Sequence, residues 1–173
     1  MPAQRMEGSD DIDDDRLVAH EELIAANEDR VGDGDDDEIP VGAVVISSAG
    51  DIVGRGHNIR EQSADPTAHA EVVALRAAAA RLGHWRLGGC TLVVTLEPCA
   101  MCAGAVILSR VDRLVMGAWS PDAGAVGSVW DIVRDRRAGS RPEVVSGVLE
   151  AECSALLAGW FAGRRDGRTA PAG

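Results

Sequence analysis

The sequence predicts a layered α/β domain in which strands alternate with helices. Short apolar runs bounded by turn residues recur along residues 39–165, and alanine-rich or amphipathic segments separate several of them. This alternation is typical of folds in which helices pack on a sheet. The length of 173 residues suits one domain with a hydrophobic core of its own.

The strands are predicted from apolar runs and the turns between them. Ala49-Gly50-Asp51 is a turn signal between the first two runs, and residues 91–96 show little alternation of polar and apolar side chains. A strand without alternation is buried on both faces, so we expect this one in the centre of the sheet. The expected strands are residues 40–46, 52–56, 91–96, 113–117 and 143–148.

The helices are predicted from their boundary residues. Asp65-Pro66-Thr67 is typical of a helix start with proline in the first turn, and the alanine-rich segment after it runs to Leu82 and ends at Gly83. A second helix is expected from about Pro98 to Ser109, and a last one over about residues 150–162.

Charge is distributed unevenly along the chain, whose net charge is -11. Residues 1–38 contain 15 acidic and 3 basic side chains, a balance of -12, whereas residues 39–173 contain 13 acidic and 14 basic ones, a balance of +1. A nearly neutral domain remains compatible with an RNA partner. The expected organisation is an acidic N-terminal extension at 1–38, partly disordered and with a helix at 16–30, a folded domain at 39–165 and a flexible tail at 166–173.

Cysteine content and hydropathy indicate a cellular compartment. The chain has only four cysteines, too few for a disulfide framework, and reduced thiols favour the cytosol. No apolar run approaches the ~20 residues of a membrane span, and the acidic N-terminus is unlike a secretory signal. We therefore expect a cytoplasmic protein without a membrane partner.

Two short motifs carry the chemistry: His69-Ala70-Glu71 and Pro98-Cys99-Ala100-Met101-Cys102. A catalytic zinc takes three protein ligands and leaves its fourth tetrahedral position to water. The imidazole and the two thiolates meet that count, while the unliganded carboxylate can carry protons from water to a leaving amine. This pattern is the signature of zinc-dependent nucleobase deaminases. We therefore predict one zinc ion (Zn2+) per chain, held by His69, Cys99 and Cys102, with Glu71 as the catalytic acid and base.

The cysteine pair allows two other interpretations. Cys99 and Cys102 alone also fit a thioredoxin-like redox pair, and a structural zinc site would add Cys90, Cys153 or a spare histidine. A redox pair does not require the His69 motif, and a structural site gains nothing from an unliganded carboxylate. Catalytic zinc is favoured on both grounds.

Residues outside the motifs have simpler interpretations. Cys153 shares a helical face with Leu149, Leu156 and Trp160, and Cys90 directly precedes a buried strand, so both cysteines are expected in the core. Trp160 and Phe161 fit either the core or an aromatic platform for a base, and Arg164 and Arg165 follow them as candidate RNA contacts.

From about residue 39 to 165 the chain resembles the bacterial tRNA-specific adenosine deaminases of the cytidine deaminase superfamily. These matches are more specific than the zinc signature that the whole superfamily shares. The matching stretches are Pro40-Val41-Gly42-Ala43-Val44, Gly56-His57-Asn58, residues 65–71, residues 95–105, Gly117-Ala118, residues 124–128 and the helix before Trp160-Phe161.

The resemblance implies a three-layer α/β/α domain of the cytidine-deaminase-like kind, with a central five-stranded mixed sheet. It also implies a homodimer and the hydrolytic conversion of adenosine to inosine at the wobble position, with the tRNA anticodon loop as partner. Base recognition is carried over onto Asn58, Ala70 and Val41. The alternative is a deaminase of a free base or nucleoside, of the guanine or cytosine type.

The chain departs from the family pattern away from the zinc motifs. Ser120 and Asp122 stand where the family usually has an aspartate and, two residues on, a lysine. Gly139-Ser140 stands before Arg141 where the family commonly has Asn-His. These departures predict intact chemistry and looser selection of the anticodon loop.

Overall fold

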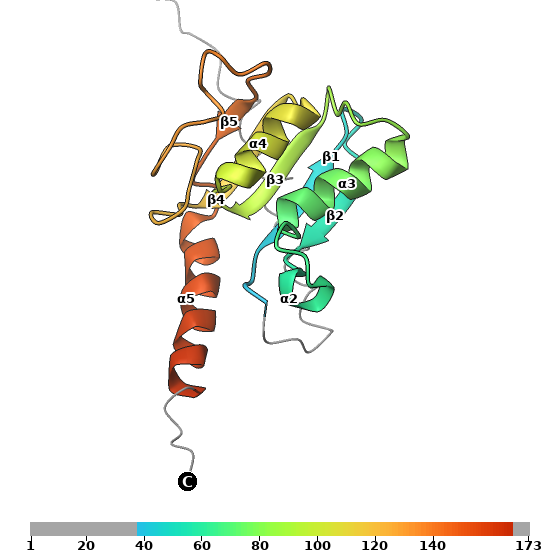
Figure 1. Cartoon of the computed structure of the whole chain (residues 1–173). Coiled ribbons are helices and arrows are strands. Elements are labelled where there is room, and N and C mark those ends of the chain that lie inside the picture. The colour runs from blue at the N-terminus through green and yellow to red at the C-terminus, as the bar shows by residue number, and fades with distance from the viewer. Residues whose placement is uncertain (1–37, 168–173) are drawn as a thin grey trace, which may run out of the picture.

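The computed structural model describes residues 38–167, with side chains through Arg164 (Figure 1). The predicted acidic extension with its helix at 16–30 lies outside the described residues, apart from Glu38. So does the predicted tail beyond Gly167, while residues 166 and 167 end the last helix.

One five-stranded mixed sheet forms the centre of the described chain, in the order β2-β1-β3-β4-β5. β1 pairs antiparallel with β2 and β3, whereas β3, β4 and β5 run parallel. This confirms the predicted α/β fold with a mixed sheet, and β3 is the central strand as expected. The elements are β1 (Gly42–Ile46), β2 (Ile52–His57), α2 (Arg60–Ser63), α3 (Ala70–Leu82), β3 (Thr91–Leu96), α4 (Ala100–Ser109), β4 (Arg113–Ala118), β5 (Glu143–Val145) and α5 (Glu150–Gly167).

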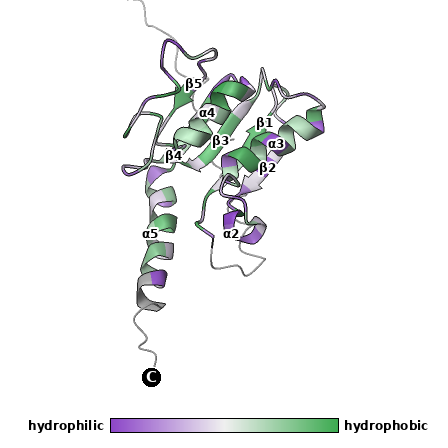
Figure 2. Cartoon of the chain, in the orientation of Figure 1, coloured by the Kyte–Doolittle hydropathy of each residue, from purple (hydrophilic) through white to green (hydrophobic). Residues whose placement is uncertain are grey.

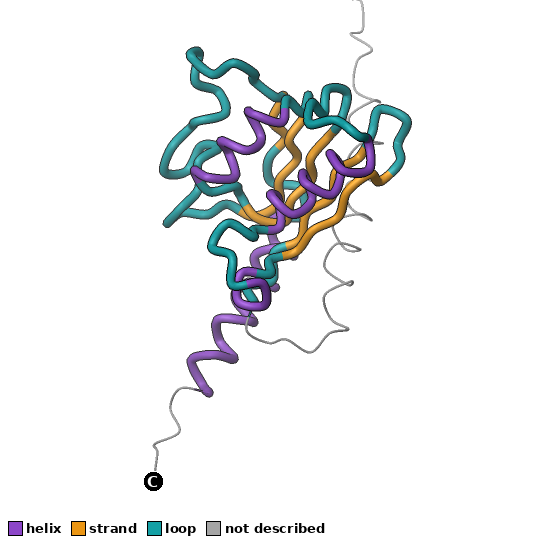
Figure 3. The backbone as a smooth tube through the Cα atoms, turned by 45° about the vertical axis from the view of Figure 1, so that its right-hand side comes forward, coloured by secondary structure: helices purple, strands orange, loops and turns teal. Residues whose placement is uncertain are grey.

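Helices lie on one face of the sheet, while α5 begins at the other face and runs beyond the end of the sheet (Figures 1 and 3). α3 and α4 lie side by side on one face, as the views in Figures 1 and 3 agree. Alternate strand residues point toward them and build the main core, among them Val45, Leu92, Val94, Leu114 and Met116. The intervening residues form a second apolar cluster on the opposite face, where the chain enters α5: Val44, Val93, Val115, Val148 and Leu149. Figure 2 shows the apolar colour concentrated on the inner strands and α4.

Small residues allow the helices to approach the sheet closely. Ala70, Ala74 and Ala78 recur every fourth residue on the buried face of α3, and all are fully buried. They face Gly54 and Gly56 of β2, where an added Cβ would lie 2.7 Å from the Ala78 nitrogen and 2.5 Å from the Ala74 nitrogen, respectively. α3 is therefore fixed against β2 with no side chain between the two backbones.

Gly56→Ala is expected to lower the free energy of unfolding by about 1–3 kcal/mol, because overpacking of a close contact forces backbone shifts. Urea denaturation measures the change. The matched control is Gly159→Ala on α5, where the space is open and alanine is expected to stabilise by about 0.4–1 kcal/mol. Equal stability of the two variants would contradict the close packing of α3.

Several boundaries differ from those predicted. α3 begins at Ala70 and not near Pro66, because the Asp65 carboxylate accepts hydrogen bonds from the backbone nitrogen (2.8 Å) and hydroxyl (2.7 Å) of Thr67 and so forms a turn. α2 was not predicted. β5 stops at Val145, short of residue 148, because the chain turns at Gly147 with a φ of 75°.

The prediction for the last helix was correct in part. α5 continues past residue 162 to Gly167. Cys153 is buried as predicted and Leu149 packs on the second apolar cluster. Leu156 was wrongly assigned to the same buried face, since it is 45% exposed. No helix in the described part of the chain is both long and apolar enough to cross a membrane.

Candidate metal centre and active site

Three candidate zinc ligands meet where α3 and α4 begin. His69 is the N-cap residue of α3, Cys99 is the N-cap residue of α4, and Cys102 lies in the first turn of α4. The Nδ1 atom of His69 is 3.7 Å from the Cys99 sulfur and 3.5 Å from the Cys102 sulfur. All three ligand atoms lie within 4.8 Å of one another.

These distances fit one zinc ion. Zinc bonds of about 2.3 Å to sulfur and 2.0–2.1 Å to nitrogen place the ligand atoms of a tetrahedral site about 3.6–3.8 Å apart. Two thiols and an imidazole are also the donor types that zinc prefers. The metal group found among the described residues has three donors, which leaves one tetrahedral position open, as catalytic sites require.

The two thiols have very different acidities. The hydrogen bond from Cys102, and next the one from His69, lowers the pKa of Cys99 to about 3. The same pairing with Cys99, together with burial, raises the pKa of Cys102. The bond to Cys99 also raises the pKa of His69. The site therefore favours the thiolate form of Cys99, which is the form of cysteine that binds a metal.

Glu71 lies in the first turn of α3, two residues after His69, and is only 4% exposed. Burial is the main cause that raises the pKa of its carboxyl to about 6. The charge of Cys99 also raises this pKa, whereas a hydrogen bond with the Cys102 side chain lowers it. A carboxyl with a pKa close to neutrality can both accept and return a proton.

Asn58 follows β2 and reaches the start of α3. Its Oδ1 accepts a hydrogen bond from the Ala70 nitrogen (2.9 Å), and its own backbone nitrogen donates to the Val41 oxygen (3.3 Å). The three residues predicted to recognise the base are thus in contact. Because the amide oxygen of Asn58 already accepts a hydrogen bond from Ala70, its NH2 group is the part that can donate to an acceptor on a substrate.

A cavity of about 140 Å³ lies beside Asn58. It is lined by Glu38, Ile39, Asn58, Arg60, Glu61, Trp160 and Arg164. The guanidinium of Arg164 stacks on the Trp160 ring, 4.5 Å from its centroid. The structure therefore brings two of the four predicted RNA contacts close to Asn58, one of the residues predicted to recognise the base, although the three candidate zinc ligands do not line this cavity.

The other two predicted RNA contacts are placed differently. Phe161 meets the Trp160 ring edge-on at 4.9 Å and is 49% exposed, so its ring lies on the surface and not in the cavity. The side chain of Arg165 lies outside the described part of the chain.

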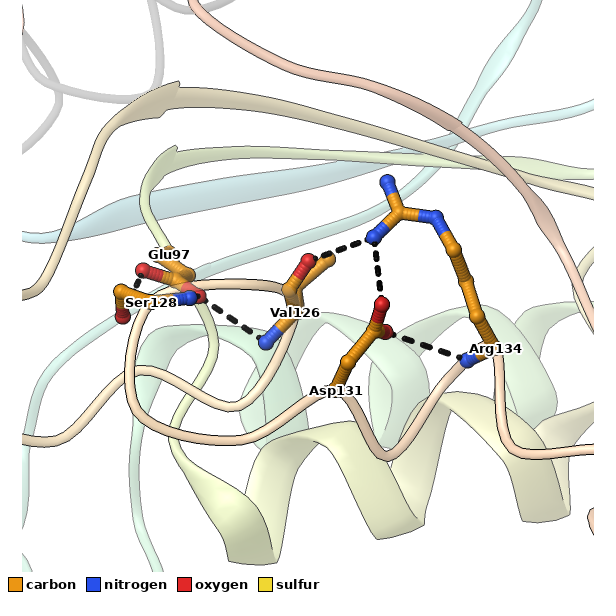
Figure 4. A network of polar contacts seen from close by, with 5 residues as sticks. All are labelled: Glu97, Val126, Ser128, Asp131 and Arg134. Carbon is orange, nitrogen blue, oxygen red and sulfur yellow. Dashed lines mark hydrogen bonds and ion pairs between the residues drawn. The ribbon is translucent and has the colours of Figure 1, made fainter.

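Sequence reasoning missed the role of Glu97, which lies directly before the second motif. Glu97 is 2% exposed, and its carboxylate accepts four hydrogen bonds from the loop after β4. Figure 4 shows Glu97 with two of the bonded residues, Val126 and Ser128. Burial favours a higher pKa, but the hydrogen bonds, with that of the Ser128 side chain first, hold the pKa of Glu97 below its usual value. The signal in the sequence was an acidic residue at the end of a buried apolar strand.

The departures from the family pattern all lie in this same loop. Ser120 is half-buried and donates its backbone nitrogen to Glu97 (3.0 Å), whereas Asp122 is exposed. Gly139 is exposed with open space around it, and Ser140 is half-buried.

Comparison with known proteins identifies the family. Residues 17–118 match the sequence model of the cytidine and deoxycytidylate deaminase zinc-binding region. The chain belongs to the cytidine and deoxycytidylate deaminase family. Its match to the tRNA-specific adenosine deaminase of Bacillus subtilis (strain 168) is 48% identical over 124 residues, which are 72% of this chain and 76% of that protein.

Two solved structures place this deaminase within the family. One, from a study of A-to-I editing by tRNA:A34 deaminases at the wobble position of transfer RNA, is 38% identical with a TM-score of 0.73, covering 79% of this chain and 99% of that one. The guanine deaminase from Nitrosomonas europaea is 30% identical with a TM-score of 0.61, covering 85% and 82% of the two chains.

Proposed function

We propose that this deaminase converts adenosine to inosine at the wobble position of tRNA by zinc-dependent hydrolysis. The observation that carries the proposal is the 48% identity to a tRNA-specific adenosine deaminase over most of both chains. The structural likeness is also greater to the tRNA:A34 deaminase than to the guanine deaminase, with TM-scores of 0.73 and 0.61.

His69, Cys99 and Cys102 would hold the zinc ion, since their donor atoms have the types and spacing that the metal needs. When bound, zinc lowers the pKa of water to about 7 and so makes a nucleophile available at neutral pH. Glu71 removes a proton from the attacking water and delivers protons to the purine ring nitrogen and to the departing ammonia. One water is consumed, the C6–N bond breaks and inosine forms.

Asn58 and the backbone of Ala70 orient the base for this reaction. The Asn58 side chain is 6% exposed and is fixed through its oxygen by the Ala70 nitrogen. Its NH2 group then donates to an acceptor on the base edge, while Val41 supports the Asn58 backbone. A base-reading group fixed in advance loses little conformational freedom on binding.

The experiment that tests this function offers the protein two classes of substrate. Unmodified tRNA with adenosine at the wobble position is incubated alongside free guanine, adenosine and cytidine, and inosine and ammonia are measured. We expect inosine in the tRNA and no comparable ammonia from the free compounds. Deamination of a free base with no reaction on tRNA would instead support the base or nucleoside deaminase.

The end of α5 is proposed to contact the anticodon loop. Replacing Arg164 and Arg165 together by alanine is expected to raise the KM for tRNA about tenfold, because each arginine supplies a phosphate contact, and to leave zinc content unchanged. Arg81→Ala with Arg86→Ala is the matched control, because Arg81 lies in the last turn of the 13-residue α3 and Arg86 follows its end, about 16 Å or more from the start of the helix. An unchanged KM in the first variant would remove α5 from the RNA interface.

We also propose that the chain forms a homodimer. The outer face of α4 is apolar, with Leu108 74% exposed, Met101 36% exposed and open space at Gly104. Apolar residues grouped on one helix face favour a protein interface over solvent. We expect a solution mass of twice 18.1 kDa by light scattering, and the mass of one chain for Leu108→Asp. Leu156→Asp, on exposed α5, is expected to stay dimeric.

A tRNA substrate also implies a cytoplasmic enzyme. The four free cysteines of the chain agree with a reducing compartment.

A further inference from the structure

Glu97 connects the second metal motif to the long segment between β4 and β5, residues 119–142, called here the β4–β5 loop. We propose that Glu97 is a positioning residue that holds this loop beside the metal centre and thereby determines how tightly the RNA substrate binds. The inference rests on the proposed function for its substrate. Its structural part concerns only contacts within this chain.

The carboxylate of Glu97 satisfies four donors of the loop at once. Oε1 accepts from the backbone nitrogens of Val126 (2.9 Å) and Ser128 (3.1 Å). Oε2 accepts from the backbone nitrogen of Ser120 (3.0 Å) and the Ser128 hydroxyl (2.6 Å). An ionised carboxylate offers acceptor sites on both oxygens, whereas an amide would turn a donor toward one pair of these donors. A charged acceptor is therefore specifically suited to this position.

The backbone beside Glu97 joins the same loop to the metal motif. The Pro98 oxygen accepts from the Ala125 nitrogen (2.8 Å), and Cys99 forms an isolated β-bridge with Gly124. A Cβ at Gly124 would collide with the Glu97 carboxylate and the Ser128 hydroxyl. Glycine is thus needed there for the loop to pass directly beside a candidate zinc ligand.

A second contact fixes the carbonyl group of Val126. The Val126 oxygen accepts from Arg134 Nη1 (2.8 Å), which also lies 3.0 Å from Asp131 Oδ2 (Figure 4). The Val126 nitrogen meanwhile donates to Glu97, so both polar atoms of this residue are fixed. The Arg134–Asp131 pair is 46% and 42% exposed and contributes little by itself. The buried Glu97 is therefore the principal anchor.

The positions of the loop side chains indicate an effect on binding and not on the reaction. The candidate ligands and Glu71 lie at the starts of α3 and α4, whose buried faces pack against the sheet in the main core. The loop instead presents exposed aromatic rings, Trp119 (37% exposed) and Trp130 (54% exposed), which can stack on unpaired bases. Displacing the loop would move these rings, while α3 and α4 keep their packing against the sheet.

The hydrogen bonds to Glu97 do not depend on the side chains that depart from the family pattern. Ser120 contributes its backbone nitrogen, so the identity of its side chain does not affect that bond. Among the residues bound to Glu97, Ser128 is the one that uses a side chain. The position of the loop is thus preserved while its surface chemistry differs from that of relatives.

Glu97→Gln tests the proposal with an anticodon stem-loop RNA that carries adenosine at the wobble position. We expect the KM to rise about tenfold or more while kcat stays within about threefold, the pattern of lost binding. Zinc content is expected to stay at one ion per chain. Asp135→Asn is the matched acid-to-amide control in the same loop, because its carboxylate bonds only with the exposed Arg137; its KM is expected to be unchanged.

Hydrogen exchange provides a measurement that does not depend on activity. In Glu97→Gln the amides of Ser120, Val126 and Ser128 are expected to exchange faster, with those of α3 and α4 unchanged. If the wild-type protein ignores RNA, the proposed function fails, and the exchange result still decides whether Glu97 fixes the loop.

Ser128→Ala is the milder second variant, because it removes only the hydroxyl that bonds with Glu97 and with the Ser120 oxygen, and keeps the carboxylate. We expect a smaller rise in KM, and a double variant with Glu97→Gln that is no worse than Glu97→Gln alone. Unchanged KM and exchange in Glu97→Gln would overturn the proposal. A collapse of kcat with loss of zinc would overturn it too, since Glu97 would then serve the metal centre.

Discussion

Glu71→Ala is expected to lower kcat by at least about 10²–10⁴-fold, the usual contribution of a general acid and base. The side chain is 4% exposed and lies beside the candidate ligands without belonging to the three-residue metal group. Its removal takes away the group that moves protons and leaves all three metal donors in place. Turnover is measured on wobble-adenosine RNA, and zinc content by elemental analysis of the same sample.

The control for this prediction is Glu152→Ala, an exposed glutamate on α5 that is expected to keep full activity. Both variants are expected to retain zinc and to give circular dichroism spectra like that of the wild type. If Glu71→Ala keeps activity within a few-fold of wild type, another group must carry the protons.

Cys99→Ser is expected to lose most of its zinc, because a serine hydroxyl stays protonated at neutral pH and is a poor zinc ligand. The pKa of Cys99 is held at about 3, so this position supplies a thiolate over the whole physiological range. The protein is purified by gel filtration in buffer treated to remove metals, and its zinc is measured per chain.

Cys90→Ser is the matched variant, since Cys90 is buried at the start of β3, outside the metal group. We expect it to keep one zinc ion per chain. Full retention of zinc by Cys99→Ser would exclude this cysteine from the ligand set.

The sheet and the metal group could be predicted because local sequence determines them. Residues 91–96 are apolar on both faces, and only a central strand buries both. His69 and Cys99 each follow a non-helical segment and precede an apolar helical run, which places them at helix N-termini. Local sequence does not show that the two motifs lie close together in space. Their residue types predict it, because together they supply the three ligands of one zinc ion.

Other features depend on contacts between distant parts of the chain and carry no local signal. Trp160 lines the cavity beside Asn58, about a hundred positions away in sequence, only because α5 runs past the end of the sheet. The four donor atoms that bind Glu97 belong to three residues, which lie 23 to 31 positions further along the chain. The turn at Asp65 was misread because a carboxylate that bonds to Thr67 favours a turn as well as a helix start.

The contact between Gly54, Gly56 and the alanines of α3 has a consequence for how the metal is acquired. Because β2 and α3 touch backbone to backbone, the start of α3 is fixed by the apolar interior and not by the ion. Zinc fingers, by contrast, are unfolded without their metal. In this chain we expect folding alone to bring the ligands together. A chelator is then expected to remove the ion without unfolding the protein, and the folded apo protein to bind metal again. Cobalt could then replace zinc in the intact protein and report the coordination geometry by its visible absorption.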